Sequence, residues 1–125
     1  ECTVQRAQSN TPLQALVLLN DPIMIETARA LATRMVREGG NEVRAQIAFA
    51  CTTVLNRAPT SAEFGVLLDH HERLREQYAN DVDAAKSLLA IGERPVPNDI
   101  DPMQLAALTG VARVILSLHE TLTRY

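Results

Sequence analysis

The stretch NTPLQALVLLNDP, residues 10–22, contains two successive helix starts. Thr11 and Asp21 are residue types that cap a helix N-terminus, and each precedes a proline at the first helical position, where a missing N–H costs nothing. Pro22 also disfavours helical geometry at Asp21, so a first helix must end near Asn20. The residues between the two prolines are mostly apolar, with helical spacing. The stretch therefore predicts a short helix, a sharp corner and a longer helix.

The same kind of punctuation divides the rest of the chain. We expect helices over about residues 22–38, 42–56, 61–78, 81–91 and 102–122, with starts capped by Asn41, by Thr60 in a capping box with Glu63, by Asn80 or Asp81, and by Asp101. The glycine pair at 39–40 is expected to end the second helix by supplying a left-handed residue, and Gly92 is expected to end the fifth. Residues 93–101 hold two prolines and three acids, which predicts a loop.

Each of the longer predicted helices has one apolar face. The expected core positions are Met24, Ala28, Leu31, Ala32, Met35, Val36, Val43, Ile47, Ala50, Cys51, Val54, Leu55, Phe64, Leu67, His71, Leu74, Tyr78, Val82, Ala85, Leu88, Leu89, Leu105, Leu108, Ala112, Ile115, His119 and Leu122. Arg29, Arg34 and Arg37 fall outside the stripe of their helix and are expected in solvent. No segment has the period of two of a half-buried strand. The pattern predicts one all-α domain over residues 1–125, an irregular bundle of five or six helices.

Composition narrows the class of protein. Hydrophobic residues are 46% of the 125 residues but aromatic residues only 3%, so aliphatic side chains and alanines must fill the core, which suits closely packed helices. The net charge is −3 and basic residues form no run, which disfavours a nucleic-acid binder. The longest strongly apolar stretch, residues 15–19, is far too short to span a bilayer. The chain opens on Glu1 with neither an initiator methionine nor a signal-type segment, so we expect it either to begin within a larger multidomain protein, as its C-terminal part, or to follow a processed segment.

The three histidines and Cys51 are the main candidates for chemistry. His71 and His119 both fall on apolar stripes and could face each other, and with Glu120 they would make a conceivable metal site. No metal-ligand spacing supports that site, and His70 points about 100° away from His71 on a helix. A hydrogen-bonded, partly buried histidine is therefore the favoured interpretation. Cys51 lies at an apolar helical position, and its flanks, Ala50 and Thr52, offer neither a base nor an electropositive setting, which predicts a buried, unreactive thiol.

Other catalytic and cofactor motifs are missing from the sequence. It contains no nucleophile elbow, no glycine-rich phosphate loop, no calcium loop and no C-x-x-C-H haem attachment motif. Gly65 and Gly110 lie inside predicted helices, and a close helix crossing is the usual reason for that. We therefore predict no catalytic residue, no metal and no cofactor in this segment.

Several motifs resemble a known family. They are ECTV at residues 1–4, the stretch 10–22, NRAPTSAE at 56–63, Gly92-Glu93, and LHETLTR at 118–124. Together they are similar to the C-terminal domain of unknown function in large planctomycete proteins, many of which carry an N-terminal cytochrome-c-like domain. The chain departs from that pattern at Leu108, Ser117 and His119, where we expect Trp, Asn, and an acid or Asn. The resemblance implies an extracytoplasmic location (periplasmic or cell surface), an upstream export signal and a haem in an upstream domain. It implies no catalytic residue.

Two functions compete. The first is a non-catalytic helical module that packs on upstream domains of the same chain, for which an exposed apolar patch would be evidence. The second is a lobe of an extracytoplasmic enzyme or redox protein that contributes His71, His119 or Gln14 to a shared site, for which a polar pocket would be evidence. The candidate structural or docking motif comprises Asn10, Thr11, Pro12, Gln14, Asn20, Asp21 and Pro22, where capping leaves Gln14 and Asn20 not fully explained.

Overall fold

The computed structural model describes residues 21–124, with side chains through His119, and this range is all-α without a strand. Its helices are α3 (Pro22–Glu38), α4 (Val43–Leu55), α5 (Ser61–Asn80), α6 (Val82–Leu89) and α7 (Pro102–Arg124). The predicted helical bundle is confirmed. The short helix expected before Asn20 lies outside the described residues. None of the described helices combines the length and apolar character needed to cross a membrane.

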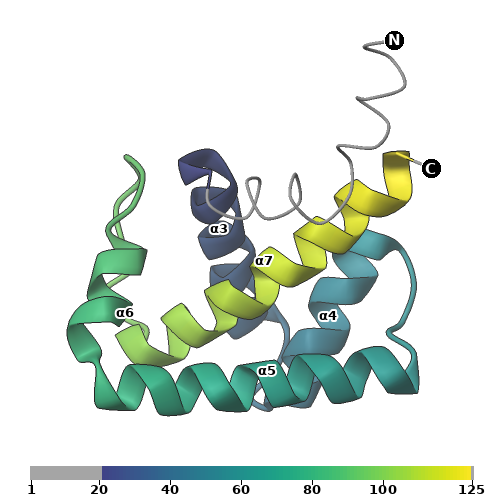
Figure 1. Cartoon of the computed structure of the whole chain (residues 1–125), viewed down its shortest axis with the longest axis horizontal. Coiled ribbons are helices and arrows are strands. Elements are labelled where there is room, and N and C mark those ends of the chain that lie inside the picture. Colours follow the sequence, from purple (N-terminus) through teal and green to yellow (C-terminus); the bar gives the residue numbers. More distant parts are fainter. Residues whose placement is uncertain (1–20, 125) are drawn as a thin grey trace, which may run out of the picture.

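The last helix is the centre of the bundle. Helix α7 runs diagonally across the molecule and packs against α3, α4, α5 and α6 (Figure 1). Helix α5 lies along one edge, and α6 turns back from its end towards α3. Each of the other described helices contacts α7, so the middle of α7 faces the core on nearly all sides. All eight residues from Leu105 to Ala112 are buried.

Small side chains allow this close packing. Ala28 and Ala32 of α3, and Ala106 and Ala112 of α7, have no exposed surface. Alanine lets two helix backbones approach closely, and the larger aliphatic side chains fill the layers between them. The aliphatic and alanine core expected from the composition is therefore observed.

Cap chemistry was the most reliable signal for helix starts. Side-chain oxygens of Asp21, Thr60, Asp81 and Asp101 each accept a hydrogen bond from a first-turn backbone N–H, at 2.8 to 3.2 Å. The capping box is complete, because the Glu63 carboxylate also accepts from the Thr60 N–H at 2.9 Å. These predictions are confirmed.

The prediction that Asn41 caps the third helix is wrong. Helix α4 begins at Val43 after Glu42, whose side chain makes no capping hydrogen bond. Gly40 has a φ of 103°, and the buried Gln46 side chain donates to the Gly40 carbonyl oxygen at 2.9 Å. A hydrogen bond from Gln46, inside α4, therefore fixes the turn that precedes the helix. Residue types that cap helix N-termini do not predict such a bond.

Arg29 is the largest error of the sequence reading. It was expected in solvent, but it is 4% exposed. Its guanidinium donates to the Leu89 carbonyl oxygen, donates to that of Arg94 at 2.7 Å, and lies 3.5 Å from that of Ile91. These are carbonyls at and beyond the end of α6, where helices lack intrahelical partners. Helix α6 accordingly ends at Leu89 rather than at Ile91.

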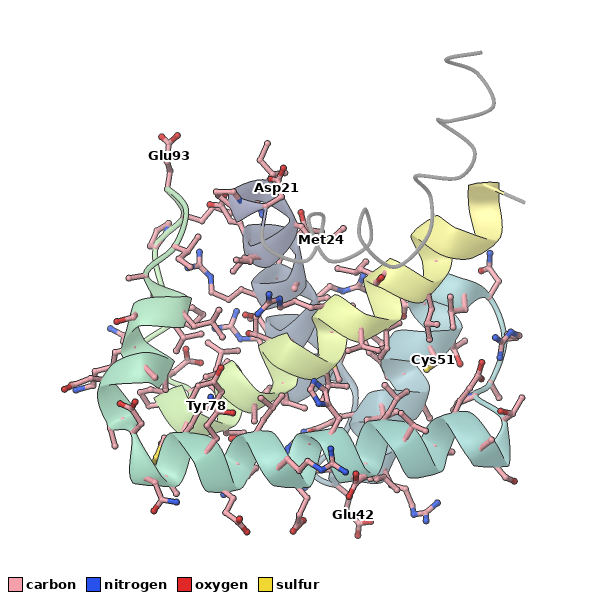
Figure 2. The ribbon with its side chains drawn as sticks, viewed as in Figure 1. Asp21, Met24, Glu42, Cys51, Tyr78 and Glu93 are labelled. Atoms are coloured by element: carbon pink, nitrogen blue, oxygen red, sulfur yellow. The ribbon has the colours of Figure 1, made fainter. Side chains whose placement is uncertain are left out.

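The carboxylate of Glu26, one turn before Arg29, completes the contact. It accepts from the N–H groups of Glu93 and Arg94 at 3.0 and 2.7 Å. Gly92 has a φ of 98°, and a Cβ there would lie 2.6 Å from the Glu26 carboxyl carbon. We call Glu26, Arg29 and the backbone of residues 89–94 the polar latch. It joins α3 to the loop that leads into α7, the loop whose tip carries Glu93 in Figure 2.

Three smaller predictions also differ from the structure. Val82 was assigned to the core but is 40% exposed at the first position of α6. Gly65 was expected at a close helix crossing, yet nothing lies within 4 Å of a Cβ placed there. His119 was placed on the apolar stripe of α7 but is exposed.

Candidate functional site

An apolar groove lies between α5 and α7. It is a hollow of about 250 Å³ lined by Ala62, Glu63, Val66, Leu67, Val114 and Leu118. Leu67 forms its buried floor at 2% exposure, whereas Val66 is 65% exposed at its rim. An isopropyl group that stays in water on a well-packed helix contributes little to folding. The rim residue is therefore available for contact with another surface.

The groove continues into a second hollow with a different character. This mixed hollow has a volume of about 220 Å³, is lined by His70, Leu74, Tyr78, Gly110, Arg113 and Val114, and shares Val114 with the apolar part. Figure 2 shows Tyr78 between α5 and α7. Leu74 packs directly over Gly110, where a Cβ would lie 2.3 Å from its Cδ1. The close helix crossing predicted for Gly110 is therefore confirmed. At this crossing, residues of α5 and α7 come together and line the mixed hollow.

The surroundings in the mixed hollow favour the uncharged form of His70, and Arg113 adds a positive charge to its lining. Burial lowers the pKa of His70, and the charges of Arg73 and Arg113 lower it further, while Asp69 and the Gly110 backbone act in the opposite direction. Burial raises the pKa of the Tyr78 hydroxyl, against the influence of Arg113. At neutral pH the hollow thus combines a neutral imidazole, a phenol and a guanidinium.

The other end of the groove has its charges already paired. Arg57 forms an ion pair with Glu63 at 2.7 Å. The hydrogen bonds from Arg57 and from the Thr60 backbone lower the pKa of the Glu63 carboxyl to about 2. Glu63 is therefore ionised at neutral pH and is engaged within the domain, as part of the α5 cap.

The predicted motif of residues 10–22 is described only at its end. Asn10, Thr11, Pro12, Gln14 and Asn20 lie outside the described residues. Asp21 is the cap of α3, and Pro22 is its first residue. Ile23, which follows them, is 74% exposed, so an apolar side chain is in contact with solvent at the start of this helix.

The histidines that the sequence singled out do not form one site. His71 is 6% exposed and its Nε2 atom has no hydrogen-bond partner, so the predicted burial is found but the predicted hydrogen bond is not found at this atom. His119 is exposed. Over the range with described side chains, no three His, Cys, Asp or Glu residues are grouped to hold a metal ion.

Sequence reasoning missed the residues of the mixed hollow. His70 was treated only as the neighbour of His71, and Arg113 and the Tyr78 hydroxyl received no role. A usable signal existed in Gly110, since an internal helix glycine marks the point where α5 side chains cross α7. Cys51 is free and 1% exposed, and burial raises the pKa of its thiol. This confirms the predicted buried thiol.

Comparison with known proteins gives one family. The family model described as PSD1, protein of unknown function (DUF1553), matches residues 1–71. No curated protein and no solved structure matches the chain. The family match covers the predicted motif, α3, α4 and the first half of α5.

Proposed function

The chain belongs to the PSD1 family of proteins of unknown function (DUF1553), and from this membership we propose that it is a non-catalytic helical interaction module of a larger exported protein. The observation that carries the proposal is the apolar groove between α5 and α7 with Val66 exposed at its rim. Contiguous exposed apolar surface is typical of docking sites, and Val66 adds to the apolar surface of this hollow.

The described helices bury their core without help from that groove. Leu105, Leu108 and Ile115 of α7 have no exposed surface, and the caps of α3, α5 and α6 are satisfied internally. The groove is thus additional to a complete core. This division supports a module that folds as a unit and then presents a face to a neighbour.

The proposed neighbours are upstream domains of the same chain. The resemblance of residues 1–22 to the C-terminal domains of large planctomycete proteins supports this context. It also supports an extracytoplasmic location and a cytochrome-c-like domain upstream. Any haem would then be bound by that upstream domain, and this domain would pack beside it.

Association between the separate parts tests the proposal. We call the proposed larger protein the parent protein. The parent protein without this domain is titrated with the 125-residue chain, and binding is followed by calorimetry. We expect a one-to-one complex with a dissociation constant in the micromolar range or below, which corresponds to about −8 kcal/mol. Absence of binding, together with independent tumbling of the domain in the intact parent, would contradict the proposal.

The second candidate is a lobe that completes a catalytic or redox site, and the mixed hollow is the observation in its favour. His70, Tyr78 and Arg113 bring a proton-accepting ring, a phenol and a cation into one small space. Replacing His70 with Ala in the parent distinguishes the two functions. An interaction module predicts an unchanged haem spectrum and reduction potential, whereas a shared redox site predicts a shift in the potential.

A further inference from the structure

We propose that His71 is a pH-sensitive switch in α5: this helix packs in the core while the imidazole is neutral, and mild acid opens the packing by protonating it. The proposed switch acts on the folding of the domain itself, so it goes beyond the proposed function. Three observations support it, namely the burial of the side chain, its unpaired nitrogen and the charges around it.

The His71 side chain lies in the core of the bundle. It is 6% exposed and follows Leu67 by one helical turn on the face of α5 that packs inward, where Leu67 and Tyr78 are buried as well. An imidazolium at this position would lose most of its hydration, and burial therefore disfavours the charged form. The packed helix requires the neutral ring.

The buried nitrogen of His71 has no acceptor to offer a charged ring. Within the described part of the chain, the Nε2 atom has no hydrogen-bond partner. Both nitrogens of an imidazolium are donors, so the charged form would bury an N–H group without an acceptor. The Oε1 atom of Gln46, on the neighbouring helix α4, is also buried and unpaired, and no hydrogen bond joins it to His71.

The charges that act on His71 do not compensate a proton. Burial is the main reason why the pKa of His71 is lowered, and the charge of Arg75 lowers it further. Glu72 acts in the opposite direction, and His70 again lowers the pKa. These three residues all lie on α5 itself.

The helices packed on α5 supply no compensating acid over residues 21–119. None of their ionisable side chains is among the charges that act on His71. These side chains are those of Arg44 and Cys51 on α4, Asp83 and Lys86 on α6, and Arg113 and His119 on α7.

His70, the preceding residue, acts in the same direction. It lines the mixed hollow beside α7, and burial together with Arg73 and Arg113 lowers its pKa, against Asp69 and the Gly110 backbone. Two adjacent residues of α5 therefore bind a proton less readily when the helix is packed than when it is free. Acid opposes the packing of α5 at both of them.

The sign of the pH dependence follows from these two states. A histidine in the unfolded chain has its ordinary pKa of about 6.5, whereas the pKa of His71 in the folded domain is lower. Above about pH 6.5 both states are neutral at this residue, and the stability does not change with pH. Below it the unfolded chain takes up a proton that the folded domain excludes, so the unfolding constant rises about tenfold per pH unit for each such proton.

Urea melts of the chain between about pH 8 and about pH 5, the range in which histidine titrates, test the proposal. The unfolding constant should be constant at the upper end and should rise about tenfold or more per pH unit at the lower end. His71→Leu should reduce this rise by about tenfold per pH unit. Glu63→Gln is the matched control on α5, because the pKa of the Glu63 carboxyl is about 2 and its titration lies below this range.

Two measurements on the native chain do not depend on a variant that folds. The ring resonances of His71 in nuclear magnetic resonance spectra should remain those of a neutral imidazole below about pH 6.5, where a free histidine becomes charged. Hydrogen-exchange protection of the amides of residues 64–78, in α5, should fall in mild acid before that of residues 26–35, in α3.

Three results would overturn the switch. They are a stability that does not depend on pH over this range, a pH dependence that His71→Leu leaves unchanged, and a His71 ring that titrates at its ordinary pKa in the folded domain. Equal loss of protection in α3 and α5 would contradict the assignment of the opening to α5.

Discussion

The polar latch and the α5–α7 groove differ in whether their side chains are engaged within the domain. In the latch, the charged groups of Glu26 and Arg29 are directed at backbone atoms of the loop after α6, and each finds partners within the domain. In the groove, Val66 is 65% exposed at the rim of an apolar hollow.

The difference separates residues that are required for stability from residues that are available for association. Arg29 is buried, so its bonds to carbonyls are required once the chain has folded around it. Val66 is 65% exposed, so it can change with little effect on the core. We therefore expect substitutions in the latch to affect stability and substitutions in the groove to affect association.

The largest expected effect is on the latch arginine. Arg29→Met keeps the aliphatic stem but leaves the carbonyl oxygens of Leu89 and Arg94 without their donors. It should lower the free energy of unfolding by about 3 kcal/mol, the scale of hydrogen bonds from a buried charged group. Urea melts measure the change.

Arg34→Met on the same helix is the matched control. Arg34 is about half exposed, pairs with Glu38 one turn away and lies over the Phe49 ring, so its loss should cost much less than the loss of Arg29. Equal effects of the two substitutions would show that the latch has no special role in stability.

Two glycines sharpen the same contrast. Gly92→Ala forces a side chain to a φ of 98° and against the Glu26 carboxylate, so we expect a loss of about 2 kcal/mol. Gly65→Ala adds a methyl group in open space on a helix and should raise stability by about 0.5–1 kcal/mol. Thermal melts should show opposite signs, and a loss for Gly65→Ala would mean that the α5 surface is already covered.

The start of α3 is the next smaller effect. Asp21→Ala removes the side-chain acceptor for the Ile23 N–H and should cost about 1 kcal/mol, within the range for a lost cap. Pro22→Ala should cost less, because that proline mainly restricts the unfolded chain. Urea melts of the two variants give the order. A neutral Asp21→Ala that weakened association with upstream domains would instead identify Asp21 as a docking residue.

The smallest effect concerns Glu63 at the paired end of the groove. Its pKa is about 2 in the folded domain, below the ordinary value of 4.5, so its stabilisation is present above about pH 4.5 and is lost as pH falls towards 2. The side chains of Glu63 and Arg57 are 27% and 41% exposed, so solvent screening limits the contribution to less than about 1 kcal/mol. The difference in stability between the native chain and Glu63→Gln should be constant near neutral pH and should close in acid. A difference that persisted at pH 2 would exclude this ion pair as the cause.

Much of the fold could be predicted from the sequence because its signals are local. Caps at Asp21, Thr60 and Asp101 act within one turn, so three helix starts followed from residue types alone. Arg29 failed for the opposite reason. It lies on the polar side of an isolated α3, and only the return of the chain sixty residues later brings carbonyl oxygens to it.

The candidate site was less predictable. The α5 face with Leu67, His71 and Tyr78 was expected in the core, and it is buried. The groove, however, depends on how α7 crosses α5, and periodicity does not give a crossing angle. His70 lines the mixed hollow because α7 lies to that side of α5, which neither helix specifies by itself.

Hydrogen exchange of the domain alone and within the intact parent tests the account most directly. Backbone amides of residues 62–70 and 110–118, along the groove, should exchange more slowly in the parent, because docking stabilises these helices against local opening. Amides of residues 26–30 and 89–94, in the latch, should exchange at the same rate in both. Equal rates along the groove, or slowing confined to the latch, would contradict the claim that the groove is the surface this domain presents.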